Sequence, residues 1–183
     1  MTIVEKDTPN IPQGPSPQLD PLGSTGQAMQ LCVSRLKELF SQRPISTRRA
    51  IFNTYLDRYG PGSSDSTKDN WRPILRFAFP YVCYMFKSGP FRDAYVTFGV
   101  DPRKESKWAK YQTAIFYFRT GNVKTKQWEP KNIDRLWKER KNHLFTGKEL
   151  DGHVASFLFE DILDPMLRKM IDESPLRDKF NVC

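Results

Sequence analysis

The sequence predicts an α+β protein of the winged-helix type, in which a helix-turn-helix core is followed by a β-hairpin wing, with a helical extension at the C-terminus. Two observations support this fold class. Apolar residues recur at helical spacing in three segments between residues 27 and 86, and residues 94–98 and 113–118 are rich in β-branched and aromatic residues. Three short helices followed by two strands fit the plan of a winged-helix domain.

The prediction divides the 183 residues into three parts. Residues 1–26 contain five prolines and few large apolar side chains, so we expect a disordered, Pro-rich linker without a core of its own. Residues 27–121 are expected to form the winged-helix domain. Residues 122–183 are expected to supply a basic helix and a C-terminal extension that packs on that domain.

Each of the three expected core helices has a recognisable boundary. The first covers residues 27–42 and ends before Pro44. The second begins at Ser46, a good N-cap residue, and is separated from the third by a loop rich in glycine, serine and aspartate. The third covers residues 70–86 and is expected to kink or restart at Pro80.

The two expected strands enclose a basic loop. Residues 94–98 and 113–118 have β-forming composition, and the polar residues 99–112 lie between them. We expect the strands to pair as a hairpin, with this loop as the wing. Four basic residues lie in the loop, with Trp108 and Tyr111 among them: Arg103, Lys104, Lys107 and Lys110.

Two further helices are expected towards the C-terminus. Residues 132–142 fit a basic helix with one apolar face. A short apolar run at residues 153–159 leads into an amphipathic helix at residues 161–172. The apolar face of that helix is rich in methionine, which is typical of core packing, so we expect it to dock on the domain. Its members are Leu163, Met166, Leu167, Met170 and Ile171.

Basic residues are concentrated in the middle of the chain. The protein has 29 Lys and Arg against 21 Asp and Glu, a net charge of +8. Residues 27–121 hold 16 basic and 7 acidic residues, whereas residues 149–183 hold 4 basic and 8 acidic ones. So uneven a distribution of charge creates a positive electrostatic field, which favours a polyanionic partner. Double-stranded DNA is the partner we expect. A basic protein without such a partner is the alternative.

Further candidates for DNA binding lie outside the expected wing. Arg72 and Arg76 are four positions apart on the third helix and therefore share a face, and arginine is the side chain best suited to a bidentate contact with guanine. They could instead pair with Asp69 or face water. The remaining candidates for phosphate contact, each of which could equally be structural, are Arg48, Arg49, Lys87 and Arg92.

Other classes of site lack the residues they need. No run of about 18 apolar residues is present, which argues against a membrane span. The three cysteines are odd in number and far apart, and the two histidines have no metal-binding spacing. We therefore expect no disulfide framework, no metal and no cofactor.

An enzymatic function is also not expected. Asp93, Glu105 and Lys107 superficially resemble the D…ExK pattern of metal-dependent nucleases. That chemistry needs the second carboxylate on a buried strand, whereas Glu105 follows Pro102 in a polar turn among basic residues. Phosphate-binding loops and serine-hydrolase motifs are missing from the sequence as well.

Three motifs resemble the signature of one transcription-factor family. Residues 88–92 read SGPFR, residues 99–104 read GVDPRK, and residues 43–50 read RPISTRRA. They resemble the SGPFR, GxDPRK and RPxxTRRA segments of the A-box-side subunit of transcription factor IIIC, the general factor of RNA polymerase III. The resemblance covers roughly residues 31–172, is greatest to the fungal members, and points to the C-terminal DNA-binding domain of that subunit.

The resemblance implies a nuclear protein that contacts the A-box promoter of transfer RNA genes. The implied partners are double-stranded DNA, the other subunits of transcription factor IIIC and the initiation factor of RNA polymerase III, with no membrane. Isolated modules of this kind are expected to bind DNA weakly and with little sequence preference.

Two questions stay open at the level of sequence. Within the motifs, Arg92 and Arg103 either bind phosphate or pair with the neighbouring Asp93 and Asp101. For the chain as a whole, a protein-interaction module of the same complex, which binds other subunits or an acidic tail, is the alternative to DNA binding.

Overall fold

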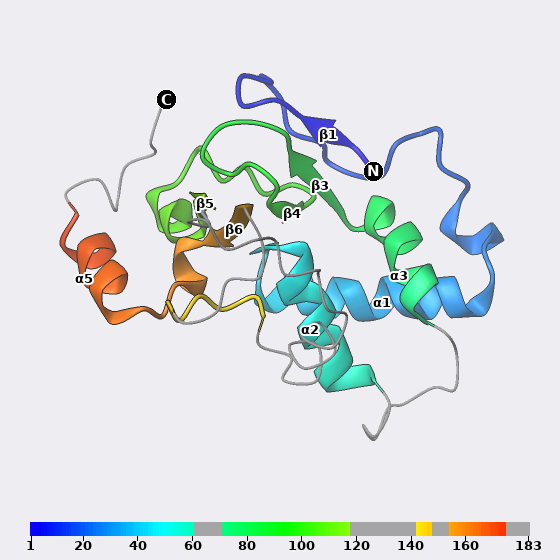
Figure 1. Ribbon diagram of the computed structural model, residues 1–183. Coiled ribbons are helices and arrows are strands. Elements are labelled where there is room, and N and C mark those ends of the chain that lie inside the picture. The colour runs from blue at the N-terminus through cyan, green and yellow to red at the C-terminus, as the bar shows by residue number, and fades with distance from the viewer. Residues whose placement is uncertain (61–70, 118–141, 148–153, 175–183) are drawn as a thin grey trace, which may run out of the picture.

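The computed structural model describes residues 1–60, 71–117, 142–147 and 154–174 of the chain (Figure 1). The helices and strands, in chain order, are β1 (Ile3–Val4), α1 (Gln27–Gln42), β2 (Ile45–Ser46), α2 (Arg48–Tyr59), α3 (Trp71–Ala78), β3 (Cys83–Phe86), β4 (Tyr95–Thr97), β5 (Thr113–Tyr117), β6 (Val154–Leu158) and α5 (Pro165–Glu173). Short 3₁₀ helices cover Leu22–Ser24, Phe79–Tyr81, Ser106–Tyr111 and Phe159–Asp161.

The succession α1-β2-α2-α3-β3-β4 is that of a winged-helix domain, so the predicted α+β fold class is confirmed. Helix α1 packs against both α2 and α3, and in Figure 1 the three helices lie below the sheet that contains β3 and β4. The core between the helices is built on side chains that are completely or almost completely buried, among them Leu36, Tyr55 and Leu75. Burial of this apolar surface is the main stabilising term for such a domain.

The first two helices follow the sequence prediction closely. Helix α1 has the predicted bounds, and its end is set by extended backbone at Arg43 before Pro44. Helix α2 is capped by Thr47, one residue later than predicted, because its hydroxyl oxygen accepts a hydrogen bond from the backbone N–H of Ala50 at 3.2 Å. The helix then continues to Tyr59.

The third helix is shorter than predicted. It ends at Ala78, a 3₁₀ turn over Phe79–Tyr81 follows, and residues 83–86 form strand β3 instead of a further helical turn. Pro80 explains the end of the helix because it has no backbone N–H to continue the hydrogen-bond ladder. Three of the four residues of β3 are buried, so tertiary packing rather than local periodicity decided their conformation.

The predicted pairing of the strands was wrong. Strand β4 pairs with β3, with Tyr84 opposite Val96, and not with residues 113–118. Strand β5 belongs to a separate two-stranded sheet, in which Thr113 lies opposite Leu158 of β6. The wing is therefore residues 87–94, between β3 and β4, while the basic loop after β4 contains the 3₁₀ helix Ser106–Tyr111. Strand composition indicates where strands lie, but not which strand each one pairs with.

Residues 1–26 are not the free tail that we expected. Strand β1 pairs in parallel with β3, which gives a four-stranded sheet with the order β1-β3-β4-β2. Val4 and Ile11 are buried in the same cluster as Tyr84 and Phe86 of β3. An exposed edge of β3 would leave backbone donors and acceptors unpaired, and β1 supplies partners for them.

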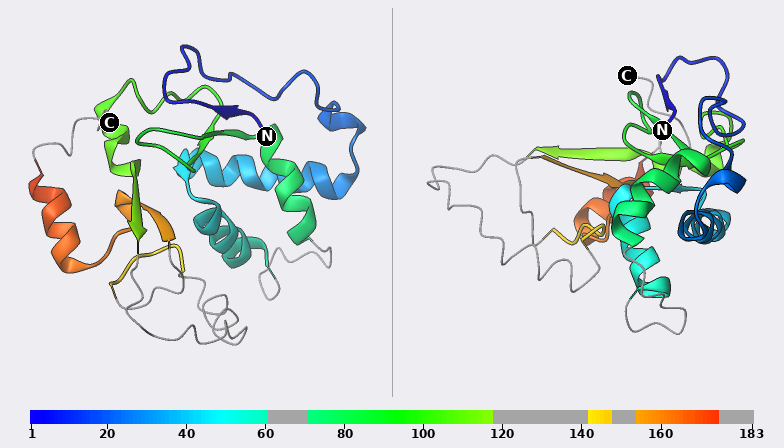
Figure 2. Two further views of the ribbon diagram at one scale, coloured as in Figure 1. Left: turned by 45° about the horizontal axis from the view of Figure 1, so that its top comes forward. Right: turned by 90° about the vertical axis from the view of Figure 1, so that its right-hand side faces the viewer.

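The C-terminal part forms its own apolar cluster, on the opposite side of α2 from α3 (Figure 2). Phe145, Phe157 and Ile162 are buried in it, and Leu167 and Ile171 of α5 pack against them. The helix begins at Pro165 rather than at residue 161, and the other members of the expected apolar face are exposed, contrary to the prediction that the face docks: Leu163, Met166 and Met170. The expected basic helix at residues 132–142 lies almost wholly outside the described residues. A bilayer-spanning helix is absent from the described ranges.

Candidate nucleic-acid interface

The SGPFR motif forms the wing between β3 and β4. Phe91 is buried against Phe86, with 6.1 Å between the ring centroids, and anchors the turn. Gly89 has a φ of +79°, a conformation that favours glycine, and a Cβ at this position would lie 2.7 Å from Cβ of Lys6. The motif therefore sets the shape of the wing and its close contact with the N-terminal segment.

Neighbouring segments hold the wing on two sides. On one side, the Ser88 hydroxyl donates to the Glu5 carboxylate at 2.6 Å and accepts from the backbone N–H of Lys6 at 3.0 Å. On the other side, the backbone N–H of Thr113 donates to the carbonyl of Pro90 at 2.7 Å. These contacts fix the position of the wing relative to the rest of the domain.

Two candidate cations on the wing are exposed and loosely paired. Lys87 Nζ lies 3.3 Å from a carboxylate oxygen of Glu5, and Arg92 Nε lies 3.6 Å from one of Asp93. The hydrogen bond from Ser88 and the ammonium of Lys87 lower the pKa of Glu5, so this carboxylate is ionised at neutral pH. Exposed pairs of this kind contribute little to stability, so a phosphate can replace either carboxylate at small cost.

Arg103 of the GVDPRK motif is engaged inside the protein. Its guanidinium makes a bidentate pair with Asp101, through Nε and Nη2, each at 2.8 Å. Its Nη1 also donates to the carbonyls of Lys6 and Thr8, at 2.8 and 2.6 Å. The Arg103 hydrogen bonds lower the pKa of Asp101, and the same pairing raises the pKa of Arg103. The sequence left open whether Arg103 binds phosphate or pairs with Asp101, and in the structure it pairs with Asp101. Through its bonds to the two carbonyls, Arg103 also holds the N-terminal segment in place.

The three lysines that follow lie on the surface of the basic loop. Lys107 pairs with Glu105 at 2.6 Å, and its Nζ is 4.7 Å from the centroid of the Trp108 ring. Lys110 lies 3.2 Å from Glu160, just after β6. Lys104 is exposed as well. These side chains are exposed to solvent. The loop that carries them is not the wing, although the sequence predicted that it would be.

Helix α3 presents a cationic and aromatic outer face, which we define as Pro73, Arg76 and Phe77. These positions follow the i, i+3, i+4 spacing and are exposed, whereas Leu75 and Ala78 face the core and are completely buried. The guanidinium of Arg76 lies 4.5 Å from the centroid of the Phe77 ring. The Arg72 side chain lies outside what the structure describes, although its backbone belongs to the first turn of α3.

The two arginines at the start of α2 have different surroundings. Arg48 is exposed and lies over the Phe52 ring at 5.4 Å. Arg49 donates to the carbonyl of Ser156 at 2.6 Å and lies over Phe157 at 4.6 Å, so it connects α2 to strand β6. Burial lowers the pKa of Arg49. Arg49 thus has a structural role, while Arg48 remains open to a ligand.

Sequence reasoning missed two features of this surface. Phe77 was not singled out among the apolar residues of the third helix, although its spacing of four positions from Pro73 places it on the outer face of α3. Arg43 was read only as part of a motif, but it pairs with the buried Asp161 at 2.8 Å and so joins the end of α1 to the C-terminal part. No local signal reveals that contact, because the two residues are 118 positions apart.

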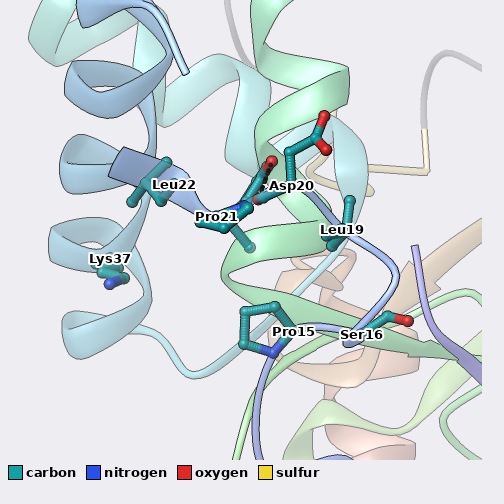
Figure 3. Close-up of a pocket in the computed structure, with 8 residues that line it drawn as sticks. Pro15, Ser16, Leu19, Asp20, Pro21, Leu22 and Lys37 are labelled. Atoms are coloured by element: carbon teal, nitrogen blue, oxygen red, sulfur yellow. Dashed lines mark hydrogen bonds between the residues drawn. The ribbon is translucent and has the colours of Figure 1, made fainter. Parts of the chain in front are cut away.

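A shallow pocket lies between the N-terminal segment and the helices (Figure 3). Prolines and leucines of that segment line most of it, together with Lys37 of α1 and Tyr81. The Tyr81 hydroxyl donates to the carbonyl of Asp20 at 3.0 Å, which closes one wall. The pocket results from packing of the N-terminal segment. Within the described residues, no group of three or more His, Cys, Asp or Glu side chains is arranged to hold a metal ion.

The chain resembles one known protein family over most of its length. Residues 1–118 match the family model described as Tau95, the RNA polymerase III transcription factor IIIC subunit HTH domain. The Schizosaccharomyces pombe transcription factor tau subunit sfc1 is 34% identical over 158 residues, which are 86% of this chain and 29% of that protein. The transcription factor tau 95 kDa subunit of Saccharomyces cerevisiae is 33% identical over 90 residues, 49% of this chain and 12% of that one.

The match to one solved structure covers a larger share of this chain, and of the other chain, than the matches to the two curated relatives do. The structure called Sfc1-DBD has a TM-score of 0.66 and 28% sequence identity, and the match covers 95% of this chain and 72% of that one. The chain spans less than a third of the length of the two curated relatives. Those relatives are transcription-factor subunits rather than enzymes.

Proposed function

This chain belongs to the Tau95 family of RNA polymerase III transcription factor IIIC subunits, and from that premise we propose that it is a DNA-binding domain that contacts the A-box promoter of transfer RNA genes. The cationic outer face of α3 is the observation that carries the proposal. Arg76 is exposed there, and among the described residues its guanidinium contacts a ring rather than a carboxylate. A helix of this kind fits the major groove, where arginine contacts guanine.

The wing and the start of α2 supply phosphate contacts in this proposal. Lys87 and Arg92 extend from the wing, and Arg48 from α2, while Lys104, Lys107 and Lys110 add positive charge beyond the wing. Contacts to phosphate set orientation and affinity but carry no sequence information. The isolated domain therefore binds weakly and with little sequence preference, and specificity comes from the whole factor. The protein acts in the nucleus, with the other subunits of the factor and the initiation factor of RNA polymerase III as partners.

The direct test is fluorescence anisotropy with a labelled A-box duplex and a scrambled duplex, over a salt series. We expect affinity to fall steeply with salt, and Arg76→Ala to weaken binding to both duplexes by about tenfold, as loss of a charged contact typically does. Lys169→Ala on α5 is the matched control, since it removes the same charge from an exposed side chain at the opposite end of the molecule. Absence of binding even at low salt would contradict the proposal.

The exposed part of α5 favours the second candidate function, a protein-interaction module of the same complex. Met166 and Met170 are among the most exposed apolar side chains of the described part. Charge reversal at Arg72 and Arg76 separates the two functions. If the domain binds DNA, reversal abolishes DNA binding and spares assembly of the factor; if it binds an acidic protein surface, the effects are exchanged.

A further inference from the structure

Phe77 is exposed on α3 although the fold does not require it there. More than half of the residue, 53%, is accessible, whereas the aromatic residues Tyr55 and Phe79 of the same helical core are buried. An apolar ring left in water gains nothing for folding, since the hydrophobic contribution comes from surface removed from water. The position of Phe77 therefore points to a contact made outside the chain.

The direction of the ring is set by the packing of its helix. Leu75 and Ala78 are completely buried, and α3 packs on α1, so the helix cannot rotate to bury Phe77 without exposing them. Phe77 is thus held on the face opposite the core, one helical turn from Pro73. A contact presented by a packed helix is ordered before the partner arrives, which lowers the entropic cost of binding.

Arg76 completes a mixed apolar and cationic surface. Its guanidinium is 4.5 Å from the Phe77 ring centroid, a cation–π distance that restricts the arginine side chain. The N–H groups of a guanidinium lie in its own plane, so a guanidinium over a ring still has donors available at its edge. The pair therefore offers hydrogen-bond donors and an apolar ring side by side.

We propose that Phe77 packs against the C5-methyl group of a thymine in the major groove, while Arg76 contacts the adjoining base or phosphate. This inference rests on the proposed DNA-binding function and names a residue that sets its base preference. The thymine methyl is the apolar group that the major groove displays, and guanine presents there the O6 and N7 acceptors that suit arginine. The exposed apolar residues of α5 lie beside the pairs Arg168–Asp172 and Lys169–Glu173, so they lack the net positive charge that a polyanion requires.

Deoxyuridine substitution tests the contact because it removes only the methyl group. The affinity of the full 183-residue chain is measured for one duplex sequence, made with thymine or with deoxyuridine at every thymine position, at one low salt concentration. We expect the wild-type chain to bind the deoxyuridine duplex about fourfold more weakly, the loss that corresponds to one buried methyl group. Phe77→Ala loses at least as much affinity for the thymine duplex, and shows no further loss on the deoxyuridine duplex.

Two controls keep the experiment decisive. Met166→Ala truncates another exposed apolar side chain, on α5, and keeps the wild-type difference between the duplexes. The comparison of the two duplexes with the wild-type chain needs no variant, so it stands even if Phe77→Ala does not fold.

Three results would overturn the inference. Equal, salt-dependent affinity of the wild-type chain for the two duplexes would remove the methyl contact and leave the DNA-binding function intact. A Phe77→Ala variant that still discriminates between the duplexes would assign the contact to another residue, and one that binds DNA normally but fails to assemble with other subunits would assign Phe77 to a protein interface. Absence of binding to either duplex, by contrast, would reject the proposed function itself.

Discussion

Arg76 and Arg103 belong to the same basic stretch of chain, but their surroundings differ. The Arg103 side chain donates four hydrogen bonds, to Asp101 and to two carbonyls of the N-terminal segment, and it is 23% exposed. Arg76 lies on the outer face of α3, against the ring of Phe77. The set of part-buried hydrogen bonds therefore keeps the charge of Arg103 inside the protein, whereas the charge of Arg76 lies on the surface.

The largest difference between the two arginines is expected in stability. Arg103→Ala leaves the Asp101 carboxylate, 6% exposed, without its partner, and should lower the free energy of unfolding by about 3 kcal/mol. Arg76→Ala removes an exposed side chain and should change it by less than about 0.5 kcal/mol. Urea denaturation of both variants measures the difference. Equal stability of the two variants would show that the Asp101–Arg103 pair does not hold the N-terminal segment.

The turn of the wing gives the next largest effect. Gly89→Ala places a side chain at φ +79° and at 2.7 Å from Cβ of Lys6, so we expect a loss of about 2 kcal/mol in the free energy of unfolding. Gly26→Ala is the matched control, because a Cβ there meets nothing within 4 Å and the glycine has an ordinary negative φ. Thermal unfolding of the two variants distinguishes them. A Gly89 variant as stable as wild type would mean that the wing is not closely packed on the N-terminal segment.

The stability that Arg103 provides, unlike any effect of Arg76, is expected to depend on pH. Arg103 lowers the pKa of Asp101 in the folded protein. At pH values between this folded pKa and the ordinary pKa near 3.8, the Asp101 carboxyl therefore binds more protons in the unfolded state than in the folded state. The stability that the pair provides is therefore complete above pH 3.8 and is lost as the pH falls through the folded pKa. Unfolding of wild type and Arg103→Ala, measured from pH 7 to pH 2, should show the gap between them narrow below about pH 4. A gap that stays constant over this range would contradict the assignment.

The smallest effect is expected at the contact between the wing and Glu5 of the N-terminal segment. Glu5 lies 3.3 Å from Lys87, where it competes with phosphate for the ammonium group, so Glu5→Gln should raise DNA affinity by about twofold at low salt and have no effect at high salt. Glu173→Gln on α5 removes a similarly exposed carboxylate far from α3 and should leave affinity unchanged. If the Glu173 variant gains as much as the Glu5 variant, the effect is one of net charge and not of the wing.

The sequence predicted the helical half of the domain better than the sheet. Helix α1 was predicted with the correct bounds, since an amphipathic period and a following proline are local signals. Strand β3 was read as a helical turn, and the strands after it were paired wrongly, because pairing depends on partners that are far apart in the chain. The N-terminal segment was mispredicted for the same reason. Its prolines suggested a linker, but Val4 and Ile11 are buried in the core against residues far away in the sequence.

The candidate site divides in a similar way. The motifs named the family, and the charge distribution indicated a polyanionic partner. The sequence could not tell which arginines are exposed, since Arg49 and Arg103 differ from Arg48 and Arg76 only in which of the described residues pack beside them.

By itself, the sequence determined the fold class, the family and the positive field, because these depend on residue type, order and local spacing. Only the tertiary structure decided which loop is the wing, which segment covers the edge of β3, and which cations are left for a ligand. The physical reason is that hydrogen bonds and burial join residues far apart in the chain, such as Arg103 to Lys6 and Arg43 to Asp161. A charge held by such a contact has exchanged its solvation for internal partners, whereas Arg76 is exposed and, within the described part of the chain, contacts the ring of Phe77.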